Sequence, residues 1–276
     1  MSPRVADAAT YALMGAATLF FATPFLWLVS LALRTPAEVF LGAARLIPEA
    51  PTLANFGQVL TDAAFAGYLW NGVKLSTLGA GAAVLVAIPA AYACSRLRFR
   101  AKRLVLLGVL AVQMVSPLVI LIPLYRWTDR LGLIDTHAAV IAVYAATATP
   151  LCVWVLKAAF DAIPVELEES AAIDGCTRLG ILGRITLPLA APGLASAFVL
   201  AMVASWSQFL VPYLLLERDA NWPISVAIFN FAGSTSASTT QLLAAACLIA
   251  VLPAVAVFAA LQRMIVRALV AGAVKG

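Results

Sequence analysis

Charged side chains are scarce in this sequence. Asp, Glu, Lys and Arg together make up 11% of its 276 residues, whereas 63% of the residues are hydrophobic. Soluble domains carry about 25% charged residues. A soluble domain of this size also leaves too much surface in water to bury so many apolar side chains. The composition therefore excludes an ordinary soluble domain and predicts a protein embedded in lipid.

Side chains that bind metals or form disulfides are also few. His137 is the single histidine, and the four cysteines (Cys94, Cys152, Cys176 and Cys247) have no paired spacing. One histidine cannot form a metal site alone, and isolated cysteines in apolar surroundings act as small core residues. A membrane-embedded enzyme would need clustered His, Asp or Glu near the lipid interface. We therefore expect no metal site, no disulfide and no catalytic residue.

Long apolar runs are what the chain does contain, and they predict an all-α integral membrane protein with six transmembrane helices. A span of about 20 residues crosses a hydrocarbon core of about 30 Å, and lipid requires each span to satisfy its own backbone hydrogen bonds. Nothing in the chain alternates as the strands of a membrane barrel do. We expect a single transmembrane domain over residues 1–276, with spans at about 11–33, 75–94, 104–124, 138–156, 193–216 and 242–261.

The distribution of Lys and Arg predicts how these spans are oriented. With the N-terminus inside, twelve of the 18 basic residues lie on the cytoplasmic side: Arg4, Arg96, Arg98, Arg100, Lys102, Arg103, Lys157, Arg178, Arg184, Arg263, Arg267 and Lys275. The positive-inside rule then favours two cytoplasmic termini in a multi-pass protein of the bacterial plasma (inner) membrane. The net charge of +5 indicates contact with anionic lipid rather than with nucleic acid. The longest cytoplasmic loop is 157–188.

The spans lack the groups that would power transport. Between their ends they contain no Asp, Glu, His, Arg or Lys, whereas ion-coupled carriers usually need such groups near the midplane. The chain also has no G-x-x-x-x-G-K-[ST] phosphate loop, so it is not expected to hydrolyse a nucleotide. If this protein moves a solute uphill, the energy comes from another polypeptide.

The long cytoplasmic loop predicts two short helices joined by a hard turn. Pro164 suits the first turn of a helix, and the three glutamates that follow lie near the positive end of the helix dipole. Gly175 ends that helix in a left-handed conformation. Thr177 can then cap a second short helix, which Pro188 stops. A flexible linker would not be built this way.

The same loop carries a specific resemblance. The segment Glu169-Ser-Ala-Ala-Ile-Asp174-Gly175, followed by Ile185-Thr-Leu-Pro188, resembles the E-A-A-x-x-D-G and I-x-L-P coupling loop of binding-protein-dependent ABC importer permeases. Ser170 replaces the first Ala, and Leu182 stands where Phe is common. The resemblance implies a type I ABC importer permease with a cytoplasmic coupling helix between transmembrane helices 4 and 5. The residues implied to couple to the ATPase are Glu166, Glu169, Ser170, Ala171, Asp174, Gly175 and Pro188.

Other segments are similar to the carbohydrate branch of this family, in particular its maltose-type second permease. They are Pro51-Thr-Leu-Ala-Asn55-Phe56, Ala91-Tyr-Ala-Cys-Ser-Arg96-Leu-Arg98-Phe99, Leu131-Gly-Leu-Ile-Asp135-Thr136 and the tail Gly272-Ala-Val-Lys275-Gly276. The family commonly shows W-N-x-F in span five, where this chain has Trp206-Ser-Gln-Phe209. Ser207 therefore replaces the Asn of that pattern.

The resemblance implies a permease for sugars or sugar derivatives. Its expected partners are a second homologous permease, two ATPase subunits that bind ATP and Mg, and an extracytoplasmic solute-binding protein. This chain itself would hold no cofactor. Gly272, Lys275 and Gly276 are considered for a tail that contacts the ATPase. Trp206, Gln208 and Asn230 are considered for a substrate path. Ser234, Thr235 and Ser236 are considered for a contact with the binding protein.

Purely structural roles are the alternative for several of these residues. The acidic helix start with its glycine cap is also what a solvated loop would use, and the polar groups of span five suit interhelical hydrogen bonding. The 233–241 segment has the composition of a flexible linker. An ABC importer for a non-sugar solute is the main alternative function, and an ion-coupled carrier is a second.

Overall fold

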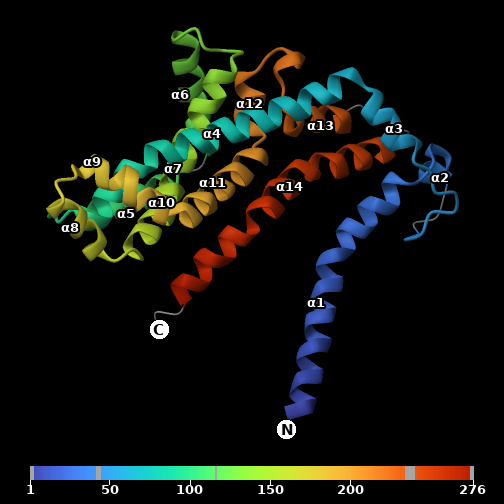
Figure 1. The fold of residues 1–276 in the computed structure, drawn as a ribbon. Coiled ribbons are helices and arrows are strands. Elements are labelled where there is room, and N and C mark those ends of the chain that lie inside the picture. The colour runs from blue at the N-terminus through green and yellow to red at the C-terminus, as the bar shows by residue number, and fades with distance from the viewer. Residues whose placement is uncertain (1–2, 42–44, 116, 234–239, 274–276) are drawn as a thin grey trace. The chain divides into compact units, whose positions relative to one another are not determined.

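The computed structural model describes residues 3–41, 45–115, 117–233 and 240–273, and every regular element in those ranges is a helix (Figure 1). This confirms the all-α prediction. The elements are α1 (Pro3–Ala32), α2 (Pro36–Leu41), α3 (Ala54–Thr61), α4 (Ala63–Arg96), α5 (Lys102–Val112), α6 (Pro117–Arg130), α7 (His137–Asp161), α8 (Val165–Ile173), α9 (Arg178–Ile181), η1 (Leu182–Thr186), α10 (Leu187–Leu189), α11 (Ala191–Trp206), α12 (Leu210–Leu215), η2 (Asp219–Asn221), α13 (Ile224–Gly233) and α14 (Thr240–Ala273).

Two compact units make up the chain. The first comprises residues 1–66 and 227–252, and the second comprises residues 67–226 and 253–276. In the first unit, the buried side chain of Asn55 donates two hydrogen bonds, to the carbonyl oxygens of Ala32 (2.7 Å) and Arg34 (2.8 Å). The last carbonyls of a helix have no partner within it. Asn55 therefore fixes α3 to the end of α1, which gives the P-T-L-A-N-F segment a structural role.

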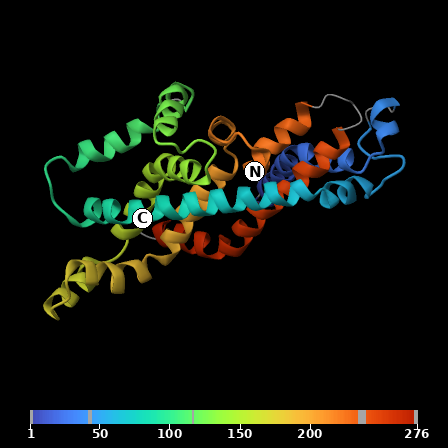
Figure 2. The same cartoon turned by 90° about the horizontal axis from the view of Figure 1, so that it is seen from above.

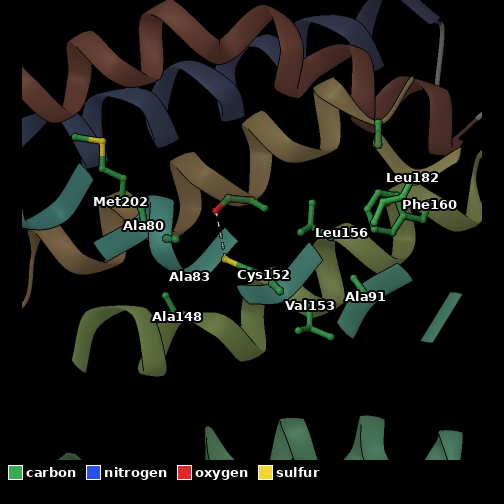
Figure 3. Packing of buried hydrophobic residues seen from close by; sticks show 14 of the residues in the cluster. Ala80, Ala83, Ala91, Ala148, Cys152, Val153, Leu156, Phe160, Leu182 and Met202 are labelled. Carbon is green, nitrogen blue, oxygen red and sulfur yellow. Dashed lines mark hydrogen bonds between the residues drawn. The ribbon is translucent and has the colours of Figure 1, made fainter. Parts of the chain in front are cut away.

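The second unit is built on α4, α7 and α11, which pack through small side chains. Its core includes four alanines on one face of α4, namely Ala80, Ala83, Ala87 and Ala91, together with residues of α7 and α11 (Figure 3). A Cβ added at Gly79 of α4 would lie 2.7 Å from the Cβ of Tyr144 on α7. Close approach over small residues is how helices associate in lipid, where no hydrophobic force drives them together.

Four helices are long and apolar enough to cross a membrane among the residues described: Thr10–Ala32, Ala63–Arg96, His137–Asp161 and Thr240–Gln262. The second, fourth and sixth predicted spans lie within them, and the first, at 11–33, extends one residue beyond Ala32. A fifth candidate is the bent pair Arg178–Leu189 and Ala191–Trp206, whose axes differ by 78°. The chain is thus a multi-pass membrane protein, and the count of six spans stays a prediction.

The third and fifth predicted spans are each divided between two helices. Residues 104–124 fall on α5 and α6, and α6 begins at Pro117, whose missing N–H needs no partner in a first turn. Residues 193–216 fall on α11 and α12, with a break over 207–209. The carbonyl oxygen of Gln208 in that break accepts a hydrogen bond from the hydroxyl of Ser225 (2.9 Å). Irregular backbone at membrane depth requires such partners.

Large apolar side chains cover much of the exposed surface. Phe20, Phe21 and Phe25 on α1 are 74%, 70% and 60% exposed, and α5 and α6 also present exposed Leu, Val and Ile. In water these side chains would be unfavourable, because each apolar Å² in contact with water costs about 25 cal/mol. Lipid or another membrane subunit removes that cost. The exposed surface therefore agrees with a chain that lies in a bilayer.

Candidate functional site

The candidate site lies where the chain turns from α7 into α11, and we call residues 165–189 the α8–α10 segment. Helix α8 ends at Ile173, and Gly175 follows with a φ of +83°, so the left-handed turn predicted from the sequence is confirmed. The hydroxyl oxygen of Thr177 accepts a hydrogen bond from the backbone N–H of Gly180 (3.2 Å), which confirms the second cap. Pro164 is the N-cap of α8, one position before the first turn.

The second helix of the segment differs from the prediction. After α9 the chain continues as a π-helix, η1, and then as α10, which contains Pro188 in its first turn. Pro188 therefore does not stop the helical path, because a proline at a helix start needs no N–H partner. The sharp bend falls at Ala190, between α10 and α11.

A buried carboxylate anchors this segment. Glu168 on α8 is 7% exposed. Its Oε1 accepts hydrogen bonds from Nε of Arg96 (3.0 Å) and the hydroxyl of Thr186 (2.9 Å), and its Oε2 accepts one from the hydroxyl of Tyr92 (3.1 Å). We call these four residues the Glu168 cluster. They come from α8, η1 and the end of α4, so one side chain connects three elements.

Arg96 extends these contacts to the end of α7. Its second terminal nitrogen donates to the carbonyl oxygen of Ile163 (3.0 Å), directly before α8. Its neighbour Ser95 donates a hydroxyl hydrogen bond to Oδ1 of Asp161 (2.6 Å), the last residue of α7. Lys157 forms an ion pair with the same Asp161. The ends of α4, α7 and α8 are therefore linked by charged and polar side chains.

The Glu168 cluster was not predicted from the sequence. Glu168 was expected only as part of an acidic helix start, and Arg96 only as one of the basic residues that set topology. A weak signal was present: Glu168 and Ala171 are three residues apart and so share one face of a helix. Both are buried, while the residues between them are exposed.

The residues predicted to couple to an ATPase lie mostly at the surface of the α8–α10 segment. Glu166, Glu169, Ser170, Asp174, Gly175 and Pro188 are exposed, and Ala171 is buried. Two apolar side chains stand out beside them, because Ile173 is 88% exposed and Leu179 is 81% exposed. The segment thus presents acidic and apolar groups outward on a backbone that its own buried contacts hold. Such a surface can receive a partner protein.

A second polar cluster lies at the other end of α7. Asp135, in the L-G-L-I-D-T segment, has a φ of +58°. Its carboxylate accepts hydrogen bonds from Nδ2 of Asn221 (3.0 Å) and from the backbone N–H groups of Glu217 and Arg218 (3.1 Å each), and it forms an ion pair with the Arg218 side chain. The backbone carbonyl oxygen of Asn221 also accepts a hydrogen bond from Nε2 of His137 (2.9 Å).

The charge state of Asp135 follows from these contacts. Desolvation raises the pKa of its carboxyl, but the hydrogen bonds from Asn221, from the Arg218 side chain and from the two backbone N–H groups lower it by more. The net pKa is well below the usual range. Asp135 is therefore a fixed anion that holds residues 217–221 against the start of α7.

The remaining predicted site residues are only partly described. Trp206 is half-buried, and its ring packs on Gly72 of α4, where an added Cβ would lie 3.1 Å from it. Gln208 is half-buried in the break after α11. The side chain of Asn230 and the surroundings of Gly272 are not described, and Ser234, Thr235, Ser236, Lys275 and Gly276 lie outside the described residues. A substrate path, a contact with a binding protein and a tail contact all stay predictions.

Comparison with known proteins identifies the family. Residues 83–270 match the model of the binding-protein-dependent transport system inner membrane component. The chain belongs to this family. Its matched region includes α7, the α8–α10 segment and α11, so the candidate site lies in the part that defines the family.

Relatives and a solved structure agree with this assignment. The chain is 32% identical over 253 residues to the sulfoquinovosyl glycerol transport system permease protein SmoH of Agrobacterium fabrum, covering 92% of this chain and 88% of that one. It is 34% identical over 254 residues to the trehalose transport system permease protein SugB of Mycobacterium tuberculosis, covering 92% of each.

The fold is shared with a chain in the crystal structure of a bacterial ABC transporter involved in the import of the acidic polysaccharide alginate. The TM-score is 0.80 at 23% identity, with 95% of this chain and 97% of that chain covered. The type I ABC permease fold is thereby confirmed. The chain is a membrane permease of an ABC transporter and not an enzyme, because its relatives are permease subunits.

Proposed function

We propose that this permease forms, with a second homologous permease, the path by which an ABC importer moves a sugar or sugar derivative across the plasma membrane. ATP and Mg are bound by two separate ATPase subunits, and an extracytoplasmic protein delivers the solute. The α8–α10 segment faces the cytoplasm and docks on one ATPase. ATP-driven closure of the ATPases then stabilises one of two permease arrangements over the other.

The observation that carries this proposal is the α8–α10 segment itself. Its backbone is fixed from inside by the Glu168 cluster, while Glu169, Ile173 and Leu179 remain exposed. Ile173 and Leu179 are each exposed by more than four-fifths, and covering this apolar surface with a partner would be favourable. Glu169 beside them suits a basic side chain on that partner. The family description supports a binding protein as a further partner.

The sugar assignment rests on the relatives. The two curated relatives transport sulfoquinovosyl glycerol and trehalose by name, and the protein of similar fold belongs to an importer of alginate. All three solutes are carbohydrates or glycosides. Binding of sugars and of control solutes such as amino acids to the associated solute-binding protein tests this part separately. A solute-binding protein that takes an amino acid and no sugar would leave an ABC importer for a non-sugar solute.

The docking role is tested by charge reversal. Glu169→Lys should abolish solute-stimulated ATP hydrolysis and co-purification of the ATPase subunit, while membrane insertion stays normal. Glu217→Lys is the matched control, because Glu217 is also an exposed glutamate but lies at the other end of α7. Normal transport by the Glu169→Lys variant, or an equal loss in the Glu217→Lys variant, would refute docking through this segment.

A further inference from the structure

The Glu168 cluster has a role beyond holding one loop in place. We propose that Glu168 and Arg96 make α8 and the end of α4 move as one body, so that a force applied to α8 is passed directly to α4. Glu168 and Arg96 are thus positioning residues for transport. This inference rests on the proposed function, because it assumes that the ATPase moves the α8–α10 segment.

The geometry favours a stiff connection. Glu168 accepts three hydrogen bonds, and all three donors come from other elements: Arg96 and Tyr92 on α4, and Thr186 on η1. The side chains of the ion pair are only 11% and 8% exposed for Arg96 and Glu168. Solvent therefore screens this pair little. Separating α8 from α4 would leave a charge buried without its partner, which is far more costly than separating two exposed charges.

Arg96 also prevents α8 from rotating about its own start. Its guanidinium donates through Nε to Glu168 and through a terminal nitrogen to the carbonyl of Ile163, and these two acceptors lie on either side of the first turn of α8. The guanidinium is planar, so its donors have fixed directions. Two contacts in one plane define an orientation as well as a distance.

The cluster reaches α11 as well. Thr186 is fully buried and ends the π-helix η1, which leads through α10 into α11. Single π-helical turns often occur at functional sites. A displacement of α8 therefore acts on α4 through Arg96 and Tyr92, and on the path to α11 through Thr186. These are two of the three helices that form the core of this unit (Figure 3), and Figure 2 shows their ribbons from above.

The two neighbouring glutamates therefore have different tasks. Glu169 is exposed, so a partner can reach it. Glu168 is buried, and its carboxylate accepts three hydrogen bonds from within the permease. Stability alone would not require a buried ion pair, because apolar side chains of similar volume often serve as well or better. A requirement for a fixed orientation between two helices does explain a carboxylate with three donors.

Double electron–electron resonance on the assembled transporter tests the inference. Spin labels go on Leu167→Cys in α8 and Ala90→Cys in α4, both exposed positions, after Cys94, Cys152, Cys176 and Cys247 are replaced; Leu167 is not among the residues predicted to dock. The distance between the labels should stay the same with and without trapped ATP while the labelled complex still transports. A distance that changes with ATP in this otherwise unmodified cluster would overturn the proposal, and no destabilising variant is needed to see it.

A functional measurement complements the distance. In proteoliposomes the double variant Arg96→Met with Glu168→Leu should keep the ATPase bound and hydrolysing. Glu169, Ile173 and Leu179 are untouched, and apolar side chains of similar volume replace the buried pair without leaving an unpaired charge, so the segment stays folded. Solute moved per ATP should fall by about tenfold or more, within the range of known coupling effects. Tyr92→Phe, which removes one donor and keeps the ring packed on Phe160, should give a smaller loss in the same direction.

The outcomes separate this inference from the proposed function. If the wild-type chain neither binds an ATPase nor supports ATP-dependent uptake, the proposed function is wrong. If the wild-type chain transports and both the double variant and Tyr92→Phe move as much solute per ATP, only the role of the Glu168 cluster is wrong. A double variant that loses the ATPase altogether would also contradict the inference, because docking would then depend on Arg96 and Glu168 directly.

Discussion

The contact between α4 and α7 at Gly79 allows a quantitative test of the packing. Tyr144 is buried beneath Gly79, and an added Cβ would lie 2.7 Å from the Tyr144 Cβ and 3.2 Å from its Cδ2. Both atoms of the shortest contact are held close to a helix backbone, so neither can rotate away. Gly79→Ala therefore forces the two helices apart. Gly81, two residues further along α4, has nothing within 4 Å of the added atom.

Comparing the two alanine variants isolates the packing cost. Replacing Gly by Ala in a helix interior gains about 0.8–1.0 kcal/mol from backbone propensity at either position. Overpacking of a well-packed core costs about 1–3 kcal/mol. Gly79→Ala should thus be about 1–3 kcal/mol less stable than Gly81→Ala, and Gly79→Val should be worse than Gly79→Ala.

The assay is reversible unfolding of the purified permease in detergent micelles, followed by circular dichroism during titration with sodium dodecyl sulfate. The free energies of unfolding of the two alanine variants are compared under identical conditions. Equal stability of Gly79→Ala and Gly81→Ala would refute the close α4–α7 approach. A lower stability of Gly81→Ala would contradict it more strongly, because that position is open.

Three further predictions use other contacts. Asn55→Ala should lower the free energy of unfolding by about 1–3 kcal/mol, because two buried carbonyls lose their donor; unchanged stability in the same titration would contradict the role of Asn55. Ile173→Asp should abolish co-purification of an ATPase without lowering stability, since that side chain is 88% exposed, and continued binding would argue against apolar docking. Asp135 has a lowered pKa, so the stability it contributes is present above its unfolded pKa of about 3.9 and is lost as pH falls through the folded value; Asp135→Asn should be less stable at pH 7, and a variant with wild-type stability there would refute this.

Much of the fold could be predicted because lipid imposes simple rules. Runs of about 20 apolar residues must be helices, and α1, α4, α7 and α14 correspond to four of the predicted spans. Local capping rules placed the turn at Gly175 and the cap at Thr177, because both depend only on neighbouring residues. The family motif puts the predicted coupling residues on the α8–α10 segment, and their role in coupling stays a prediction.

Contacts between distant residues could not be predicted. Glu166, Glu168 and Glu169 are identical in type, and only the approach of Arg96, 72 residues earlier in the chain, makes Glu168 the buried one. The breaks between α5 and α6 and between α11 and α12 were also missed, since hydropathy does not register a bend, although Gln113, Ser207 and Gln208 are polar residues at the breaks. The stop predicted at Pro188 is wrong, because its position within the first turn of α10 depends on the preceding π-helix.

The proposed function depends most on which protein the α8–α10 segment touches. A photoactivatable cross-linker placed at position 173, in membranes that contain the whole transporter, measures this directly. Docking of this segment on an ATPase predicts a cross-link to a nucleotide-hydrolysing subunit, which Glu169→Lys removes. A cross-link only to an extracytoplasmic protein or to lipid, with ATP-dependent uptake intact, would contradict it.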